Sequence, residues 1–326
     1  MKDTGQLEIR DQLDDRRRRL EVALATAGPE PALQNLLREV DAALDRLGDG
    51  TFGLCETCHD PIEDELLLAD PLVRFCMPHL SDSEVRALQE DLELAARIQK
   101  GLLPKADIQA AGWSVARLYH PLGAVSGDYC DLAPAPDDSL FFAMGDVSGK
   151  GIAASMLMAH LQAMVRILVD ADTPLDQLLE KVSRTLCETT LPAHFATLAC
   201  GRAHPSGEVE MANAGHMPAL VARGDTVEEI AATGLPVGMF CQAKFSVSRV
   251  SLDPGDVLLL YTDGYTEARD SEDEEFGRER LATLLARHAR LPPRDLLEAL
   301  MHELDRFRSG TPMTDDLSLM VLQRAL

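Results

Sequence analysis

The chain has 326 residues, of which 46% are hydrophobic, and its 31 Lys and Arg against 54 Asp and Glu give a formal net charge of −23 at pH 7. This length and apolar content predict about two folded domains, whereas the negative charge argues against nucleic acid or an anionic membrane as the main partner. The sequence shows neither a secretion signal nor the ~18 continuous apolar residues of a membrane span, so we expect no membrane partner and a cytoplasmic protein.

Residues 7–47 predict two helices that are broken at residues 27–31 (AGPEP). The second helix has apolar residues three and four positions apart, as on one helix face: Leu33, Leu36, Leu37, Val40, Leu44 and Leu47. The basic run 16–19 lies among acidic residues, so we interpret it as a solvated helix face and not as a nucleic-acid site. A helical hairpin is therefore expected at the N-terminus.

Two pairs of metal-ligand residues follow the hairpin, Cys55 with Cys58 and Cys76 with His79. Each pair lets a tight turn present two donors to one ion, and the intervening loop is long enough to bring the pairs together. Four protein ligands leave no open position, so the pattern predicts one structural Zn²⁺. A pair of buried thiols or a redox pair is the alternative. His59 is next to Cys58 and would point elsewhere, so we leave it out of the site.

The seven cysteines are an odd number, which favours reduced thiols with one metal site over a disulfide framework. We interpret the four that lie outside the zinc pattern as small core or near-surface residues: Cys130, Cys187, Cys200 and Cys241.

Residues 49–62 (DGTFGLCETCHDPI) and the second ligand pair resemble the DksA/TraR zinc-finger family. The resemblance covers residues 7–80. It implies a module that reaches into RNA polymerase with acidic residues at the tip of its hairpin. Here the tip has one acid and no paired aspartates, so we prefer a sensing or docking role.

A long helix is expected from Ser81 to about Leu103, where Pro104 stops it. Its stripe of Val85, Leu88, Leu92 and Ala95 spans two heptads. Two alternatives remain open: a homodimer through residues 84–103, or a helix that packs on its own domain.

From residue 113 onward the pattern predicts strands interrupted by two helical blocks. The first spans 152 to about 169 and continues over 174–189, and the second covers 278–288 and 293–308. Turn signals at 205–207 (PSG) and 253–255 (DPG) separate consecutive strands, so the sheets should be largely antiparallel. The expected strands are 113–119, 139–144, 195–202, 209–212, 219–222, 245–250, 256–261 and 317–322. The predicted fold class is α+β, with antiparallel sheets flanked by helices.

Aspartates stand where apolar strands end or loops begin, and glycines beside them allow close approach of the backbone to an ion. Such carboxylates suit two Mn²⁺ or Mg²⁺ ions, which hydrolyse phosphate esters without a covalent intermediate. Taken singly, each has an ordinary explanation as a turn or cap residue. The candidates are Asp128, Asp146, Asp263, Asp315 and Asp316.

Five motifs occur in the order seen in the SpoIIE/RsbU branch of the type 2C metal-dependent protein phosphatases, which the chain resembles over residues 97–326. They are SGDYCD at 126–131, GDVSGKGIAA at 145–154, NAGHMP at 213–218, YTDGYTEA at 261–268 and DDLSL at 315–319. The resemblance implies a β-sandwich flanked by helices and hydrolysis of phosphoserine or phosphothreonine on a protein. The implied substrate is a phosphorylated anti-sigma-factor antagonist in a partner-switching pathway.

Carried over by motif position, Asp146 would bridge two metals, the Val147 carbonyl would help to hold one, and Asp263 and Asp315 would complete the ligand set. Asp128 would bind a metal or its waters. Asp316 and Ser148 would lie behind the ligands.

Two positions depart from the wider family pattern. Ser148 stands where many members have a histidine, so the general acid is not identified, and no phosphate-binding arginine precedes Asp128. His216 is a candidate acid, but we prefer a role in structuring its glycine turn. Lys150 is a candidate phosphate contact, with an ordinary helix-entry lysine as the alternative.

We therefore expect three parts: a hairpin and zinc finger at 1–80, a connecting helix at 81–104 and a phosphatase domain at 105–326. The leading hypothesis is a protein-serine/threonine phosphatase regulated by its zinc module. The alternative is a transcription regulator that docks on RNA polymerase through that module, with the C-terminal domain as a scaffold.

Overall fold

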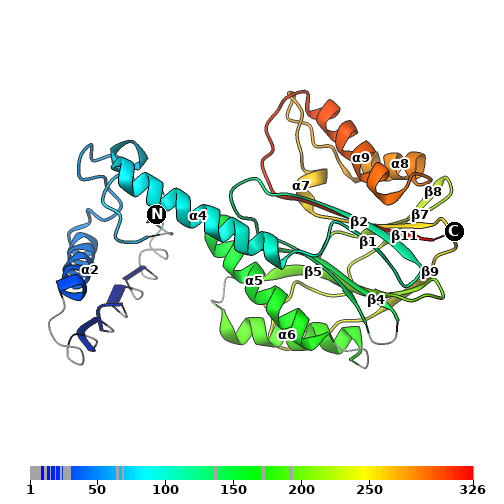
Figure 1. The fold of residues 1–326 in the computed structure, drawn as a ribbon, viewed down its shortest axis with the longest axis horizontal. Helices are drawn as coiled ribbons and strands as arrows, with labels where there is room; N and C mark the ends of the chain where they lie inside the picture. The colour runs from blue at the N-terminus through cyan, green and yellow to red at the C-terminus, as the bar shows by residue number, and fades with distance from the viewer. Residues whose placement is uncertain are drawn as a thin grey trace. The chain divides into compact units, whose positions relative to one another are not determined.

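Two antiparallel sheets with covering helices form the C-terminal part of the computed structural model, and helices with a small irregular loop region form the N-terminal part (Figure 1). The structure divides into two units, residues 1–91 and 92–326. It describes residues 9–10, 13–14, 16–18, 20–22, 24, 31–63, 66–67, 70–135, 138–169, 173–190 and 194–325.

The N-terminal unit contains α2 (Pro31–Asp49), and the described residues between 9 and 24 are also helical. Buried Leu13 and Leu20 share one hydrophobic cluster with Val40 and Ala43 of α2, so helices from both arms of the predicted hairpin contribute to one core. The same cluster includes Phe52, which joins the helices to the loop that follows. The predicted break at 27–31 falls on residues outside the described part, apart from Pro31.

The connecting helix α4 (Asp82–Leu102) has the predicted start and end. The Val85 N–H donates to the Ser81 carbonyl at 3.0 Å, and the helix ends before Pro104 because proline has no N–H to continue it. A short 3₁₀ helix, η1 (Met77–His79), lies just ahead of α4.

The C-terminal unit contains two sheets in which every described strand pair is antiparallel, as predicted. The six-stranded sheet has the order β1 (Asp107–Ala110), β2 (Trp113–His120), β11 (Leu317–Arg324), β10 (Val257–Tyr261), β7 (Ala219–Arg223), β8 (Thr226–Ile230). The five-stranded sheet has the order β3 (Asp128–Pro134), β4 (Leu140–Val147), β5 (Ala196–Ala203), β6 (Glu208–Ala214), β9 (Ser248–Ser251).

Helices cover the outer face of each sheet (Figure 1). The helices α5 (Gly151–Leu168) and α6 (Leu175–Thr189) share a core with the five-stranded sheet. The helices α8 (Arg278–His288) and α9 (Pro293–Arg308) share a core with the six-stranded sheet. A third cluster, which includes Trp113, Phe142 and Leu260, draws its side chains from both sheets and fills the space between them. The layered α+β architecture is thus confirmed.

Three strands and one short α-helix were not predicted: β1, β3, β8 and α7 (Asp263–Thr266). The strand β3 has the sequence DYCDLAP, whose aspartates hide the apolar pattern even though all but its last residue are buried. The turn at 253–255 also differs from a hairpin, because β9 pairs with β6 whereas β10 pairs with β7 and β11. That turn carries the chain from one sheet to the other.

The interpretation of Cys187 and Cys241 as separate thiols is wrong, because the two form a disulfide with a Cα–Cα distance of 5.4 Å. Pairing of Val237 with Ala196 places the loop after β8 beside the start of β5. The hydroxyl of Ser183 on α6 also donates to the Phe240 carbonyl of that loop at 3.2 Å. The pairing arises from contacts between elements distant in sequence, so cysteine spacing does not reveal it. Cys130 and Cys200 are buried free thiols.

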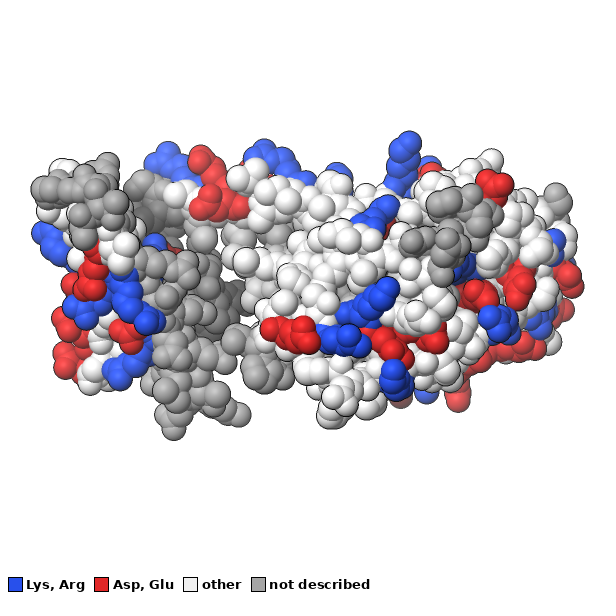
Figure 2. Space-filling model, turned by 90° about the horizontal axis from the view of Figure 1, so that it is seen from below, with Lys and Arg blue, Asp and Glu red and all other residues white. Residues whose placement is uncertain are grey.

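Among the described helices, α5 alone has the length and composition of a membrane span. Its Met158, Leu161 and Val165 are buried in the core that covers the five-stranded sheet. This helix is therefore part of the folded C-terminal unit. On the face shown in Figure 2, the described basic side chains are scattered among acidic ones.

Candidate functional site

Strand pairing brings the predicted aspartates to one end of the two sheets. Asp128 and Asp146 are register partners on β3 and β4. Thr262 follows β10 and caps α7, whose first residue is Asp263. Asp315 and Asp316 immediately precede β11, the neighbour of β10.

Asp128 connects the two sheets directly. Its carboxylate is 2% exposed, and its Oδ2 accepts hydrogen bonds from Thr262 Oγ1 at 3.0 Å and from Ser318 Oγ at 2.6 Å. Burial raises the pKa of Asp128 well above its usual value, and the nearby charges of Asp146 and Asp316 act in the same direction. A cation beside this group would therefore favour its ionised form.

Asp146 lies within electrostatic reach of the aspartates from the other sheet. The pKa of Asp146 is raised to about 7, mainly by burial. The negative charges of Asp263, Asp315 and Asp316 raise it further. Burial also raises the pKa of Asp263, and the charge of Asp315 adds to this effect. Acidic groups that destabilise one another's charge in this way mark a site that a polyvalent cation would stabilise.

Asp316 holds the loop that leads into β3. Its Oδ1 accepts from the Leu122 N–H at 2.7 Å and its Oδ2 from the Gly127 N–H at 3.1 Å. Both carboxylate oxygens are thus engaged by the backbone. Asp316 therefore holds the loop ahead of β3 in place.

Two glycines allow the close contacts at this end of the sheets. A Cβ at Gly127 would lie 3.1 Å from the Val147 carbonyl oxygen and 3.2 Å from Asp146 Oδ1. A Cβ at Gly264 would lie only 1.9 Å from the Asp316 carbonyl oxygen, which no small shift can accommodate. The loops carrying Asp128, Asp146, Asp263 and Asp316 can therefore approach one another only without side chains at these two positions.

Lys150 and Ser148 lie near the aspartates but have different partners: Lys150 contacts Asp315, whereas Ser148 contacts the backbone of Phe195. Lys150 Nζ donates to Asp315 Oδ2 and to the Thr314 carbonyl, both at 3.1 Å, and most of its side chain is exposed. The Ser148 N–H donates to the Phe195 carbonyl at 2.9 Å, and its hydroxyl oxygen accepts from the Phe195 N–H at 3.1 Å. Ser148 thus connects the loop after β4 to the chain entering β5.

The donor set suits hard divalent cations. The predicted ligands are carboxylates and one backbone carbonyl, which are the oxygen donors that Mg²⁺ and Mn²⁺ prefer. The carboxylates repel one another. Among the described residues, the one basic side chain paired with a predicted ligand is Lys150, which contacts Asp315 at the exposed edge of the site. The residues present therefore fit such ions.

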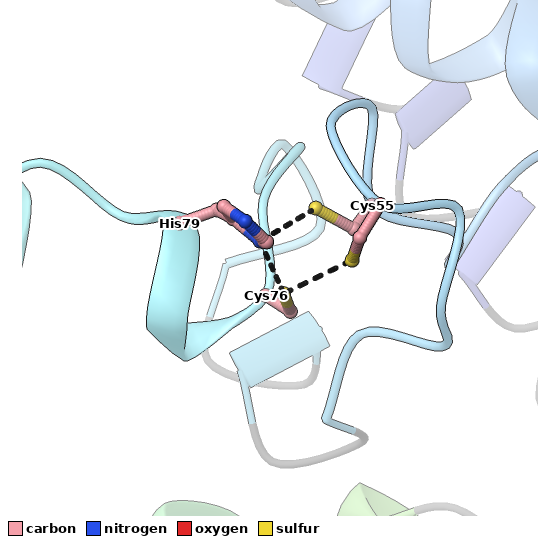
Figure 3. Close-up of side chains that lie close together, drawn as sticks. Cys55, Cys76 and His79 are labelled. Atoms are coloured by element: carbon pink, nitrogen blue, oxygen red, sulfur yellow. Dashed lines mark hydrogen bonds between the residues drawn. The ribbon is translucent and has the colours of Figure 1, made fainter.

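The four predicted zinc ligands gather in the N-terminal unit. Figure 3 shows Cys55, Cys76 and His79 close together. One donor atom from each lies within 4.8 Å of the others, and among the described residues this is the only set of His, Cys or acidic ligand atoms so closely gathered. His79 Nδ1 lies 3.1 Å from Cys76 Sγ and 3.7 Å from Cys55 Sγ. Cys58 Sγ lies 3.6 Å from Cys76 Sγ.

The pKa values of two thiols in this cluster, Cys55 and Cys76, are shifted in opposite directions. Burial raises the pKa of Cys55, but backbone N–H groups of Cys58, Cys76 and Thr57 outweigh it and bring the pKa to about 6. Burial together with the neighbouring thiols raises the pKa of Cys76 to about 12. Three thiols and an imidazole around one point form a soft donor set, which suits Zn²⁺.

Several site residues were missed by sequence reasoning because they act through contacts across the fold. Thr262 and Ser318 hold Asp128, and the hydroxyl of Thr197 accepts from the Asp146 N–H at 3.1 Å. Thr262 and Ser318 lie inside the motifs at 261–268 and 315–319, so membership of a motif could have indicated their role. Thr197 lies outside those motifs and gave none.

Comparison with known proteins covers both units. Residues 136–325 match the family model for Stage II sporulation protein E (SpoIIE), and residues 50–78 match the prokaryotic dksA/traR C4-type zinc finger. Protein IcfG of Synechocystis sp. is 29% identical over 263 residues, which are 72% of this chain but only 41% of IcfG. Phosphoserine phosphatase RsbU of Bacillus subtilis is 24% identical over 264 residues, 79% of this chain and 78% of RsbU.

A solved structure shares the fold of the C-terminal unit. The SiaA-PP2C domain of Pseudomonas aeruginosa superposes with a TM-score of 0.65 at 20% identity, covering 74% of this chain and 99% of that domain. The zinc-finger match ends at residue 78, so His79 lies just beyond it. In this chain a histidine takes the place of the fourth cysteine of a C4 site.

Proposed function

Because the chain belongs to the SpoIIE family, we propose that it is a metal-dependent phosphatase that hydrolyses phosphoserine or phosphothreonine on a protein. The observation that carries the proposal is the convergence of aspartates from both sheets, of which Asp128 is buried and Asp146 is within electrostatic reach of Asp263 and Asp315. The similarity to phosphoserine phosphatase RsbU supports the same reaction.

In this proposal two Mn²⁺ or Mg²⁺ ions would be held by Asp146, shared between them, with the Val147 carbonyl, Asp263 and Asp315 as the further ligands. Asp128 binds an ion or its waters. When bound, such an ion pair neutralises the phosphoryl group and lowers the pKa of a bound water.

The chain's own groups then have distinct tasks. Thr262 and Ser318 orient the Asp128 carboxylate through its Oδ2, and Asp316 fixes the loop ahead of β3 through two backbone N–H groups. Lys150 is exposed next to Asp315, where its ammonium group can contact a substrate phosphate.

The substrate that we propose is a phosphorylated anti-sigma-factor antagonist in a cytoplasmic partner-switching pathway. The family membership supports this class of substrate, since RsbU, named as a phosphoserine phosphatase, aligns with 79% of the chain. We also propose that residues 84–103, which include most of α4, mediate homodimer formation.

The zinc module, with one structural Zn²⁺ on Cys55, Cys58, Cys76 and His79, is proposed to regulate the phosphatase through α4. Leu88 of that helix packs against the cluster that contains Cys55 and Cys76. The alternative of RNA-polymerase docking rests on the zinc-finger match alone, because hairpin residues 27–30 lie outside the described part.

The test is Mn²⁺-dependent phosphate release from a phosphoserine protein by the purified chain. We expect Asp146→Ala and Asp263→Asn to abolish release while the circular dichroism spectrum stays unchanged. Each substitution removes a ligand of the ions that neutralise the phosphoryl group. Asp225→Asn is the matched control, since its side chain is exposed and outside the site. Undiminished release by folded Asp146→Ala protein would refute the proposal.

A further inference from the structure

His216 lies in the loop after β6 and is 5% exposed. Its Nδ1 is 2.9 Å from Thr197 Oγ1 on β5, and its backbone N–H donates to Asn213 Oδ1 at 2.8 Å. The side-chain amide of Asn213 in turn donates to the Met217 carbonyl at 3.0 Å. The imidazole therefore has its hydrogen-bond partner, Thr197, at Nδ1, while its buried Nε2 has none among the described residues, and Asn213 fixes the backbone turn that carries the ring.

The hydrogen bonds of Thr197 restrict where its hydroxyl proton can be donated. The Asp146 N–H donates to Thr197 Oγ1 at 3.1 Å, so the oxygen acts as an acceptor there and its single proton must be donated elsewhere. Two acceptors are in reach: His216 Nδ1 at 2.9 Å and the Asp146 carbonyl at 3.4 Å. The shorter contact favours donation to His216, and in that arrangement its Nδ1 is unprotonated.

The neutral state of the ring agrees with its surroundings. Burial lowers the pKa of His216 to about 4, against the opposing effect of the Tyr261 backbone. Tyr261 ends β10, two residues before Asp263. The imidazole thus lies between the strand end that carries Asp146 and the strand end that carries Asp263.

We infer that His216 is a positioning residue, which orients the Thr197 hydroxyl so that it accepts the Asp146 N–H and thereby fixes the backbone of Asp146 and Val147. This inference rests on the proposed metal site, and it separates His216 from the role of general acid. A buried donor–acceptor chain behind a ligand sets its orientation, and loss of such a partner costs metal affinity, typically ~10- to 100-fold.

The test compares paired substitutions by direct Mn²⁺ binding, followed as free Mn²⁺ by electron paramagnetic resonance. Thr197→Val and His216→Leu are expected to weaken Mn²⁺ binding by about 10-fold or more. Thr197→Ser keeps the hydroxyl, and His216→Asn places an amide oxygen near the position of Nδ1, so both should bind within about threefold of the parent chain. His302→Leu, an exposed change on α9, is the control.

A double variant distinguishes a shared chain from two separate effects. Because both residues act on the same N–H, Thr197→Val with His216→Leu should bind Mn²⁺ no more weakly than the worse single variant. Additive losses, or unchanged binding in Thr197→Val protein, would overturn the inference. Thr197→Val is nearly isosteric, and thermal unfolding checks that it is folded, so the test does not depend on His216→Leu.

Phosphatase assays give the second readout. For a positioning residue, His216→Asn retains the turnover number and the pH profile of the parent. If His216 were a general acid, His216→Asn and His216→Leu would lose turnover equally with Mn²⁺ binding intact, which would overturn the inference. Mn²⁺ binding is measured without substrate, so a parent chain that binds Mn²⁺ but releases no phosphate would refute the proposed activity and not this inference.

Discussion

Gln99 and Ser126 hold each other by two hydrogen bonds. Gln99 Nε2 donates to the Ser126 carbonyl at 2.7 Å, and Gln99 Oε1 accepts from the Ser126 N–H at 3.0 Å. The Asp128 N–H then donates to Ser126 Oγ at 3.0 Å. The last turns of α4 are thus joined to the loop that carries the first predicted metal ligand.

Gln99→Ala is expected to lower both stability and phosphatase rate. The Gln99 side chain is 6% exposed, and its loss leaves the buried N–H and carbonyl of Ser126 without these partners, at a cost of about 1–3 kcal/mol. Chemical unfolding and a rate assay measure the two effects. Lys100→Ala, which is exposed on the same helix, should match the parent. Equal rates for Gln99→Ala and Lys100→Ala would show that the Ser126 loop does not depend on α4.

Leu92→Glu is expected to change both oligomeric state and phosphatase rate, because it places a charge in the stripe of α4 without touching a predicted ligand. The change must favour one arrangement of the helix over another to alter the rate. Light scattering and turnover measurements test it. Leu94→Glu is the control, since Leu94 is 48% exposed and lies outside the stripe. If Leu92→Glu matches the parent in mass and in turnover, α4 is a passive tether.

Cys58→Ser is expected to release zinc and unfold residues 48–80 while the C-terminal unit stays folded. Closed zinc sites contribute directly to folding, and Phe52 and Ile62 belong to the same cluster as two of the thiols. Metal analysis and limited proteolysis measure the effect. His59→Ser is the control, because His59 is exposed and lies outside the ligand set. Parent protein purified without chelator that contains no zinc would contradict the prediction.

Without Mn²⁺ or Mg²⁺, the C-terminal unit should become less stable as the pH rises from about 4 to 7. Burial, with the charges of Asp263 and Asp315, raises the pKa of Asp146 from 3.8 to about 7. Between these values the folded state binds the proton that the unfolded state has released, so the free energy of unfolding falls as pH rises. Asp128 and Asp263 shift in the same direction.

Asp146→Asn removes a share of this pH dependence, and added Mn²⁺ should restore stability near pH 7 by binding the folded state. Denaturant unfolding of the dialysed protein between about pH 4 and pH 8 measures both effects. Asp225→Asn should retain the slope of the parent. A free energy of unfolding that rises with pH in the metal-free protein would contradict the assignment.

The sequence was most informative where one local pattern determines one element. The limits of α8 and α9 agree with the predicted helical blocks, and Pro104 marks the end of α4. The zinc ligands were also recognisable, because their spacing alone restricts them to two turns. For the aspartates, their order along the chain and the family resemblance were the available signals.

Features that depend on contacts between distant elements could not be predicted. The strand β3 has aspartates at 128 and 131, which suggest a loop, yet Asp131 is fully buried because Arg166 of α5 pairs with it. The contact of Gln99 with Ser126 and that of His216 with Thr197 likewise exist only once the sheets are assembled. No period or spacing in a single sequence encodes such pairs.

The disulfide between Cys187 and Cys241 means that the two units require opposite redox conditions during purification. A reductant that keeps Cys55, Cys58 and Cys76 able to bind zinc also supplies the thiolate that opens the disulfide by exchange. An oxidising buffer preserves the bond in the C-terminal unit but exposes the zinc thiols to sulfenic acid formation. Preparations that differ only in their redox buffer will therefore differ in whether the disulfide or the zinc thiols are preserved.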